Sequence, residues 1–171
     1  WPEKAELIAN GSFEEWDGDI LLGWEASNVS PEEAKVHTGR YAARLGPGAG
    51  PGTGLLHRTQ GTATTQVPGL DASLSQVVRV TPGSVYQLLF SALGTGDVPR
   101  PVEVFWLNEA GQAAGDATSP ILLPPVVLPQ YVQYARLIGP VPTSARFVRV
   151  RFNKTGSGYL VVDDVSFFRL S

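Results

Sequence analysis

The sequence has no cysteine in 171 residues, and its only two histidines are His37 and His57. Without thiols there are no disulfide bonds, no thiolate zinc sites and no cysteine nucleophiles. The two histidines also lack the clustered spacing of a His-based metal site. Any ion that stabilises this chain therefore needs oxygen ligands.

Long hydrophobic runs and a strong net charge are missing as well. No run approaches the ~20 apolar residues of a membrane-spanning helix, and no secretory signal peptide is visible. The formal net charge is -3, so nothing favours nucleic acid or an anionic membrane as a partner. The chain begins with Trp1 rather than Met, and we expect it to be a processed or excised part of a longer protein.

Recognisable catalytic patterns are also missing. No serine has the flanking residues of a nucleophile elbow. The Gly-rich segment 46–54 lacks the Lys-Ser/Thr pair of a phosphate-binding loop. We therefore predict that the protein is not an enzyme.

Glycine and proline are abundant instead, with 19 and 14 residues, and 43% of the chain is hydrophobic. No segment sustains a helical period, and there is neither a βαβ alternation nor a repeat. Roughly eight strands of ~5–8 residues, separated by turn residues, favour an all-β fold, a two-sheet antiparallel β-sandwich or jelly roll. We predict one such domain over residues 6–171, with an N-terminal extension over 1–5 and long loops over 46–70 and 112–130.

Alternation along the expected strands assigns side chains to faces. In 147–152 the hydrophobic positions form the core side, so Arg149 and Arg151 point outward. In 85–92 the larger hydrophobic set leaves Gln87 outward. The turn residues at 81–84 end strand 74–80, and we expect 74–80 and 85–92 to pair with each other.

The stretch 159–168 is a near-continuous hydrophobic run that predicts a buried strand, interrupted by Asp163 and Asp164. Neighbours on a strand point to opposite faces, so Asp163 is expected to share a face with Val165 and Phe167. An ionised carboxylate in apolar surroundings needs a cation, a metal ion or hydrogen bonds. We expect one of the two aspartates to point into a core with such a partner and the other to face solvent.

Five short motifs occur in a suggestive order along the chain. They are Asn10-Gly11-Ser12-Phe13-Glu14, Gly23-Trp24, His37-Thr38-Gly39-Arg40-Tyr41, Leu74-Ser75-Gln76 ahead of Thr81-Pro82-Gly83, and Val162-Asp163-Asp164-Val165. This order, over nearly the whole chain, resembles the CenC-type carbohydrate-binding modules (families 4, 9 and 22) within the galactose-binding-like β-jelly rolls. The resemblance implies a two-sheet β-sandwich in which Trp24 is a packing residue.

The resemblance also implies a structural calcium ion that ties the N-terminal segment to the last strand. Carried over by position, its ligands are the carboxylates of Glu14 and Asp163, with backbone oxygens around Ser12, His37 and Arg40. Calcium prefers six to eight oxygen ligands of these kinds. The alternative is that Asp163 is neutralised by backbone N–H groups or an arginine without a metal ion, and Asp164 remains a second candidate ligand.

Sugar binding requires flat aromatic rings and planar polar side chains. The candidates of this chemistry are Trp106, Tyr134, Gln87, Arg149 and Arg151, with the last three expected on one exposed sheet face. The resemblance thus implies a non-catalytic module of an extracellular or cell-surface protein that binds a polysaccharide or glycan. The alternative is a structural or protein-interaction domain of the same fold, in which the apolar residues of 120–129 dock on another chain or mediate self-association.

Overall fold

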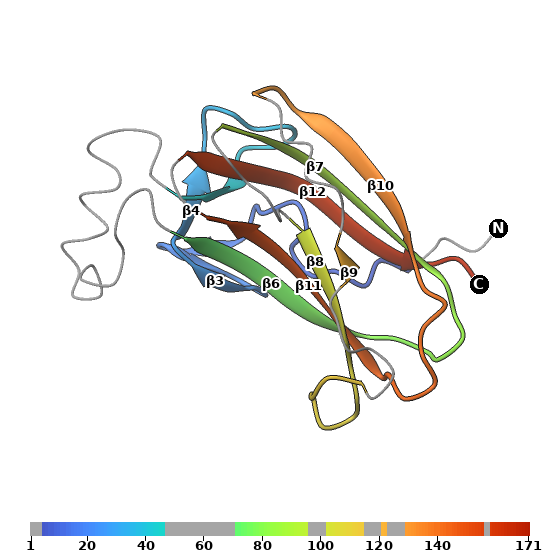
Figure 1. Cartoon of the computed structure of the whole chain (residues 1–171). Helices are drawn as coiled ribbons and strands as arrows, with labels where there is room; N and C mark the ends of the chain where they lie inside the picture. The colour runs from blue at the N-terminus through green and yellow to red at the C-terminus, as the bar shows by residue number, and fades with distance from the viewer. Residues whose placement is uncertain (1–4, 47–70, 96–101, 115–120, 123–128, 156–157) are drawn as a thin grey trace.

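The computed structural model describes residues 5–46, 71–95, 102–114, 121–122, 129–155 and 158–171. Two five-stranded antiparallel sheets pack face to face (Figure 1), which confirms the predicted all-β sandwich. We name the sheets after their central strands. The β12 sheet has the order β10 (Val132–Ile138), β7 (Tyr86–Thr95), β12 (Tyr159–Arg169), β5 (Ala42–Leu45), β4 (Val29–Glu32). The β11 sheet has the order β3 (Glu25–Ser27), β6 (Ala72–Arg79), β11 (Phe147–Lys154), β8 (Val102–Leu107), β9 (Ile121–Leu122).

A small hairpin of β1 (Trp16–Asp17) and β2 (Ile20–Leu21) precedes β3. The predicted N-terminal extension and the two long loops lie largely outside the described residues, namely at 1–4, 47–70, 115–120 and 123–128. His57 and most of the apolar stretch 120–129 belong to these ranges. Within the described part of the chain, no helix is long and apolar enough to cross a membrane.

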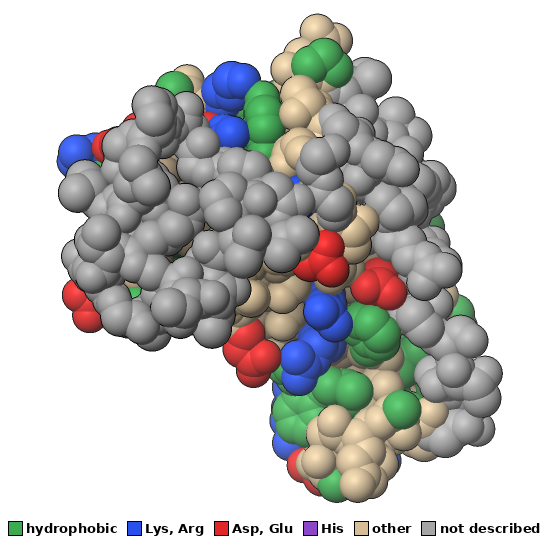
Figure 2. All heavy atoms as spheres, turned by 60° about the vertical axis from the view of Figure 1, so that its left-hand side comes forward, with side chains coloured by type: hydrophobic (Ala, Val, Ile, Leu, Met, Phe, Trp, Pro, Cys, Tyr) green, Lys and Arg blue, Asp and Glu red, His purple; other side chains and the backbone are tan. Residues whose placement is uncertain are grey.

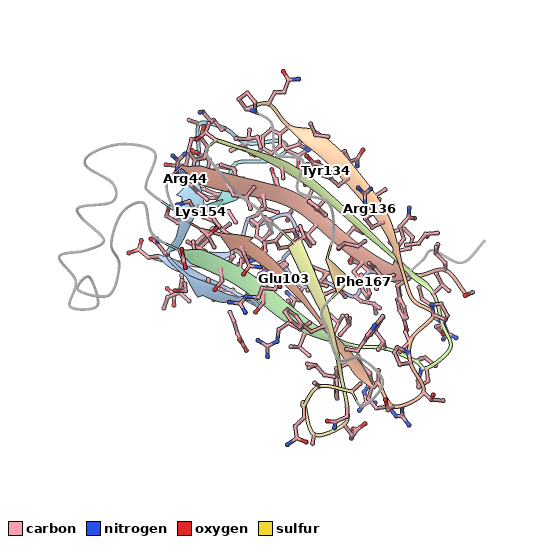
Figure 3. All side chains as sticks on the ribbon, viewed as in Figure 1. Arg44, Glu103, Tyr134, Arg136, Lys154 and Phe167 are labelled. Atoms are coloured by element: carbon pink, nitrogen blue, oxygen red, sulfur yellow. The ribbon has the colours of Figure 1, made fainter. Side chains whose placement is uncertain are left out.

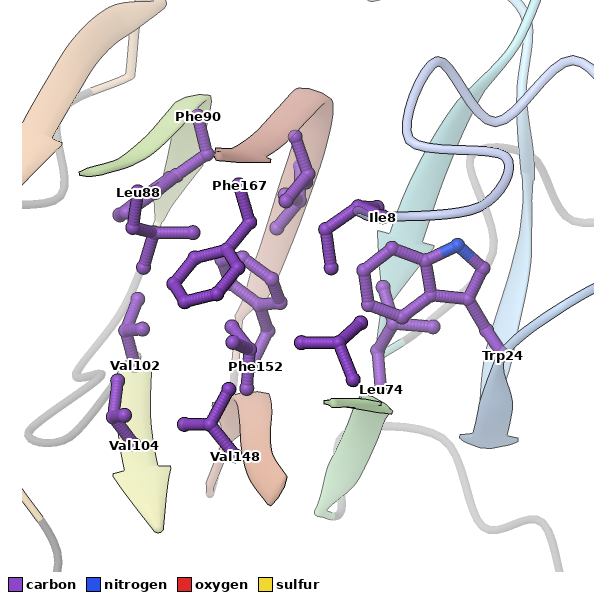
Figure 4. Packing of buried hydrophobic residues seen from close by; sticks show 14 of the residues in the cluster. Ile8, Trp24, Leu74, Leu88, Phe90, Val102, Val104, Val148, Phe152 and Phe167 are labelled. Atoms are coloured by element: carbon purple, nitrogen blue, oxygen red, sulfur yellow. The ribbon is translucent and has the colours of Figure 1, made fainter. Parts of the chain in front are cut away.

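The core lies between the sheets and follows the predicted alternation. On β11, Val148, Val150 and Phe152 are fully buried, while Arg149 and Arg151 point to the outer side and are half-buried. Aromatic rings from several strands meet in this core, together with aliphatic side chains from both sheets (Figure 4). Its labelled members are Ile8, Trp24, Leu74, Leu88, Phe90, Val102, Val104, Val148, Phe152 and Phe167. Trp24 is 8% exposed, which confirms its prediction as a packing residue.

The expected pairing of strands 74–80 and 85–92 is wrong. β6 pairs with β3 and β11, whereas β7 pairs with β10 and β12, so the turn between them carries the chain from one sheet to the other. A neighbouring loop holds this crossing: Gly83 N–H donates to the Val141 carbonyl (2.8 Å), and Val141 N–H donates to the Ser84 carbonyl (2.9 Å). Turn residues alone do not distinguish a hairpin from such a crossing.

A β-bulge lies in β12 at the two aspartates. The register with β7 shifts between Asp163 and Ser166, so Asp164 and Val165 together occupy the space of one residue on the partner strand. Asp164 adopts a left-handed conformation (φ 50), which aspartate tolerates better than most residues. The bulge also turns the Val165 N–H toward the Gly11 carbonyl (2.8 Å).

Because of the bulge, the side chains of the last strand lie on other faces than predicted. Before it, Val161 packs in a small cluster on the outer side of the β12 sheet, and Asp163 is on that same side. After it, Val165 and Phe167 belong to the core between the sheets. Asp163 therefore does not share a face with Val165 and Phe167, because the extra residue reverses the alternation beyond it.

Candidate functional site

The first cluster of polar groups surrounds the bulge, on the outer side of the β12 sheet. The Asp163 side chain is fully buried there and accepts three backbone hydrogen bonds. Its Oδ2 accepts from the N–H groups of His37 (2.9 Å) and Thr38 (3.1 Å), and its Oδ1 accepts from Asp164 N–H (2.8 Å). Asp163 is thus the buried aspartate with partners that the sequence predicted, although it points away from the central core.

Asp164 holds the same segment from its partly exposed position. Its Oδ2 lies 2.6 Å from His37 Nδ1, and its Oδ1 accepts from Thr38 Oγ1 (2.6 Å). The His37 ring packs against Tyr131, with ring centroids 5.1 Å apart. The two aspartates therefore fix both the backbone and the side chains at 37–38.

Glu14 fixes the next residues of the segment. Its Oε1 accepts from the N–H groups of Arg40 (2.9 Å) and Tyr41 (3.0 Å). Gly39 lies under this carboxylate with φ 72, and a Cβ there would lie 2.2 Å from Glu14 Oε1. Glycine at this position is required both by the left-handed backbone and by the close approach.

The donor chemistry of this cluster fits calcium in part. Glu14 and Asp163 both bind segment 37–41, and Glu14 Oε2 has no hydrogen bond among the described residues, so acceptor capacity remains. His37 and Arg40 present N–H groups to the carboxylates, however, and in the described chain no hydrogen bond joins Ser12 to either carboxylate. In the same part of the chain no three acidic or histidine side chains form a metal-binding group. Calcium thus stays a prediction, and its remaining ligands would be backbone carbonyls.

The electrostatics of the cluster follow from burial. Burial raises the pKa of Asp163 to about 6, the nearby Asp164 charge acts in the same direction, and the backbone N–H bonds limit the rise. Burial also raises the pKa of the neighbouring Tyr131 hydroxyl, with further contributions from the charges of Asp163, Glu32 and Asp164. Asp163 is therefore ionised at neutral pH, although burial destabilises its charged form.

A buried ion pair lies on the same side of the β12 sheet. Arg44 Nη1 and Glu32 Oε1 are 2.8 Å apart, and both side chains are almost fully buried. The Arg44 guanidinium also stacks over the Tyr159 ring at 3.9 Å. Nothing in the sequence indicated Glu32 as the partner of Arg44.

The second cluster is the outer face of the β11 sheet, which we call the arginine face. It comprises the outward side chains Glu25, Ser75, Val77, Arg79, Glu103, Phe105, Phe147, Arg149, Arg151 and Asn153. Arg149 lies between Phe105 and Val77 on the neighbouring strands, and Arg151 lies between Glu103 and Ser75. Basic, acidic and hydrophobic side chains are also close neighbours on the surface seen in Figure 2.

Hydrogen bonds and ion pairs organise the arginine face. Arg149 Nη1 lies 3.2 Å from Glu25 Oε2, and Asn153 Nδ2 donates to Glu103 Oε1 (2.6 Å). The Phe105 ring is half-buried beside Arg149. The face thus combines planar polar groups with part of an aromatic ring.

Three of the five predicted sugar-binding residues are not on this face. Trp106 is 6% exposed and belongs to the core, so its prediction as a stacking platform is wrong. Gln87 points outward, but from β7 in the other sheet, and is therefore on the opposite side of the molecule from Arg149 and Arg151.

Tyr134 is also remote from the arginine face. It lies on β10 at the edge of the β12 sheet, whereas Glu103 belongs to the β11 sheet (Figure 3). Its ring stacks on Phe90, with centroids 5.1 Å apart, and its buried hydroxyl has no hydrogen bond partner in the described part of the chain. Sequence reasoning missed Glu103, Phe105 and Asn153 as members of the arginine face. Their alternation with buried residues on β8 and β11 was the signal that could have found them.

Comparison with known proteins agrees with this fold. No protein-family model and no curated protein matches the sequence. A solved structure of the Family 16 Carbohydrate Binding Module-2 has a TM-score of 0.59 at 15% identity, covering 94% of this chain and 98% of that one. The CBM22-1 xylan-binding domain from Paenibacillus barcinonensis has a TM-score of 0.57 at 13% identity, with 99% of each chain covered. The chain therefore has the β-sandwich jelly-roll fold of carbohydrate-binding modules, which confirms the predicted resemblance at the level of the fold.

A longer protein also contains this fold. The enzymatically active domain of tailspike protein 4 from Bacteriophage CBA120 has a TM-score of 0.69 at 18% identity. This chain is covered over 96% of its length but spans only 21% of the tailspike chain. The two binding modules thus match along nearly their whole length, whereas the match covers only a small part of the tailspike chain.

Proposed function

We propose that this domain is a non-catalytic carbohydrate-binding module of an extracellular or cell-surface protein, and that it binds a glycan on the arginine face. The observation that carries the proposal is the pair Arg149 and Arg151, which point outward side by side from the central strand of a sheet. The fold shared with carbohydrate-binding modules supports it.

The chemistry of the arginine face suits sugar hydroxyl groups. A guanidinium offers five N–H donors in one plane, and a carboxylate such as Glu103 accepts. The exposed part of the Phe105 ring can pack against the apolar side of a pyranose. Donors, acceptors and a ring within one sheet face are the combination that glycan recognition requires.

The first prediction concerns binding. In a glycan array with soluble-polysaccharide gels, run with calcium present, the protein should bind one class of glycan. An Arg149→Gln/Arg151→Gln variant should bind that glycan at least ~10-fold more weakly, because each charge-assisted hydrogen bond contributes about 1.5–3 kcal/mol. A Gln87→Ala variant, altered on the opposite sheet, is the control and should bind normally. Equal binding by the arginine variant and the wild type would exclude this face as the site.

A second function has one specific observation in its favour. Leu137 is 68% exposed on the outer side of β10, beside the exposed Ala135. Contiguous exposed apolar surface marks contact sites for other chains, and Leu137 with Ala135 is the candidate for such a site on this sheet. A structural or protein-interaction domain should show no glycan binding and should form dimers or larger species in light scattering, which a Leu137→Lys variant would abolish.

We also propose that a calcium ion joins Glu14 to Asp163. The support is that both carboxylates bind segment 37–41 and that Glu14 Oε2 has no hydrogen bond among the described residues. An ion that binds only the folded state raises stability by mass action. It would also offset the desolvation penalty that raises the pKa of Asp163.

The pH dependence of stability distinguishes calcium from neutralisation by N–H groups alone. Without an ion, the pKa of Asp163 in the folded state, about 6, exceeds the ordinary value of 3.8 for an aspartate. The folded state then binds more protons between these values, and acidification from pH 7 to pH 5 should raise the free energy of unfolding by about 1 kcal/mol. With calcium bound, protons compete with the ion, and the same acidification should lower it.

The experiment compares wild type and Asp163→Asn by urea unfolding at pH 7 and pH 5, each with calcium and with a chelator. The difference between the two proteins isolates the contribution of Asp163 from other titrating groups. A free energy of unfolding of the wild type that is unchanged by excess chelator would contradict the calcium proposal.

A further inference from the structure

Arg151 differs from every other charged side chain of the arginine face. Among the residues that the structure describes, it makes no hydrogen bond, ion pair or ring contact. It is half-buried in the middle strand of the β11 sheet, opposite Ser75 on one side and Glu103 on the other. Ser75 is only 6% exposed although it points outward, so the surroundings of Arg151 are partly removed from water.

The charged neighbours of Arg151 already have partners. Arg149 pairs with Glu25 at 3.2 Å, and Arg79 pairs with Glu109 at 3.0 Å. Glu103 accepts from Asn153 at 2.6 Å rather than from the arginine opposite it. Among the described residues, the guanidinium of Arg151 is therefore the cation on this face whose donors are left for a ligand.

We infer that the arginine face binds glycans that carry carboxylate groups, such as uronic acid polymers, and that Arg151 holds the carboxylate. The inference rests on the proposed function and names its substrate class. A carboxylate matches the fork of donors on a guanidinium and forms two parallel hydrogen bonds with it. A neutral hydroxyl group would accept one hydrogen bond and would not form an ion pair with the half-buried guanidinium.

The overall charge of the chain does not oppose this binding. The formal net charge is -3, but at physiological salt charges separated by more than about 8 Å are largely screened. Contact between a guanidinium and a carboxylate therefore depends on the groups within a few ångströms. Of the three basic side chains on the arginine face, Arg79 pairs with Glu109 at its border and Arg149 pairs with Glu25, whereas Arg151 has no ion pair within the described residues.

The test measures dissociation constants for two carboxylated polymers, polygalacturonate and alginate, and for two neutral ones, galactan and xylan. Dextran sulfate is included as an anionic polymer without carboxylates. The variants are Arg151→Gln, Arg151→Lys and, as a matched control from the last residue of β12, Arg169→Gln. Thermal unfolding of each variant verifies that it is folded.

We expect a carboxylated polymer to bind at least ~10-fold more tightly than the neutral ones. Arg151→Gln should weaken that binding by about 10-fold to 100-fold, and Arg151→Lys should restore only part of it because lysine cannot form the paired hydrogen bonds. Arg169→Gln should bind like the wild type.

Three results would overturn the inference. Tighter binding of a neutral glycan would leave the proposed function intact and refute its acidic substrate. Equal binding of dextran sulfate and the carboxylated polymers would show a general attraction to polyanions. Binding of no glycan at all would refute the inference together with the proposed function.

Discussion

An Arg44→Leu variant is expected to lose about 3–5 kcal/mol of unfolding free energy, because Glu32 would then be a buried carboxylate without its ion-pair partner. Both side chains are almost fully buried, so water cannot replace the lost interaction. The variant would also lose the stacking of the guanidinium over Tyr159. Urea unfolding followed by tryptophan fluorescence gives the difference directly.

The control for this prediction removes both charges. A Glu32→Leu/Arg44→Leu variant has no buried charge without a partner, and replacement of a buried ion pair by hydrophobic side chains is often close to neutral. Its stability should therefore be much nearer to wild type than that of the single variant. If the single variant were as stable as the wild type, the pair would not be buried in solution as the structure has it.

An Asp163→Ala variant is expected to lose about 3 kcal/mol or more. Its carboxylate accepts from the N–H groups of His37, Thr38 and Asp164, and the truncation leaves these donors without an acceptor. Each donor left unsatisfied beside this buried position costs up to about 1–3 kcal/mol, and any bound calcium would be lost as well. Part of this cost is offset because the variant no longer buries a charge.

The neighbouring aspartate supplies the control. Asp164 is partly exposed, and asparagine tolerates its left-handed backbone conformation. An Asp164→Asn variant should therefore lose less than 1 kcal/mol, within the usual range for surface changes. Equal losses in the two variants, measured by urea unfolding, would show that the buried N–H bonds of Asp163 are not the main interaction at the bulge.

The sandwich was predictable because its strands obey a simple period. On β11 the alternate positions Val148, Val150 and Phe152 are hydrophobic, and the structure buries all three. The bulge in β12 was not predictable in this way. Alternation assumes that every residue advances the strand by one step, and the extra residue between Asp163 and Ser166 breaks that assumption.

The positions of site residues were predictable only where alternation within a single strand was enough to place them. Arg149 and Arg151 lie on one strand, and its alternation sufficed to place both outward. To decide whether Gln87 lies on the same face as these arginines, one must know to which sheet each strand belongs. The turn residues after β6 do not reveal that the chain changes sheets there. Trp106 was uncertain because both faces of its strand carry hydrophobic side chains, and only the packing between the sheets shows which face is inside.

The position of β12 has a consequence for biosynthesis. This strand follows all other strands in the chain, yet it lies in the middle of its sheet, paired with β7 on one side and β5 on the other. While the ribosome is still making residues 159–169, one edge of β7 and one edge of β5 have no partner. Unpaired strand edges bind other chains readily, and pairing between distant segments is slow. The nascent chain therefore passes through a period of exposure to aggregation that ends only when its last strand inserts between the two.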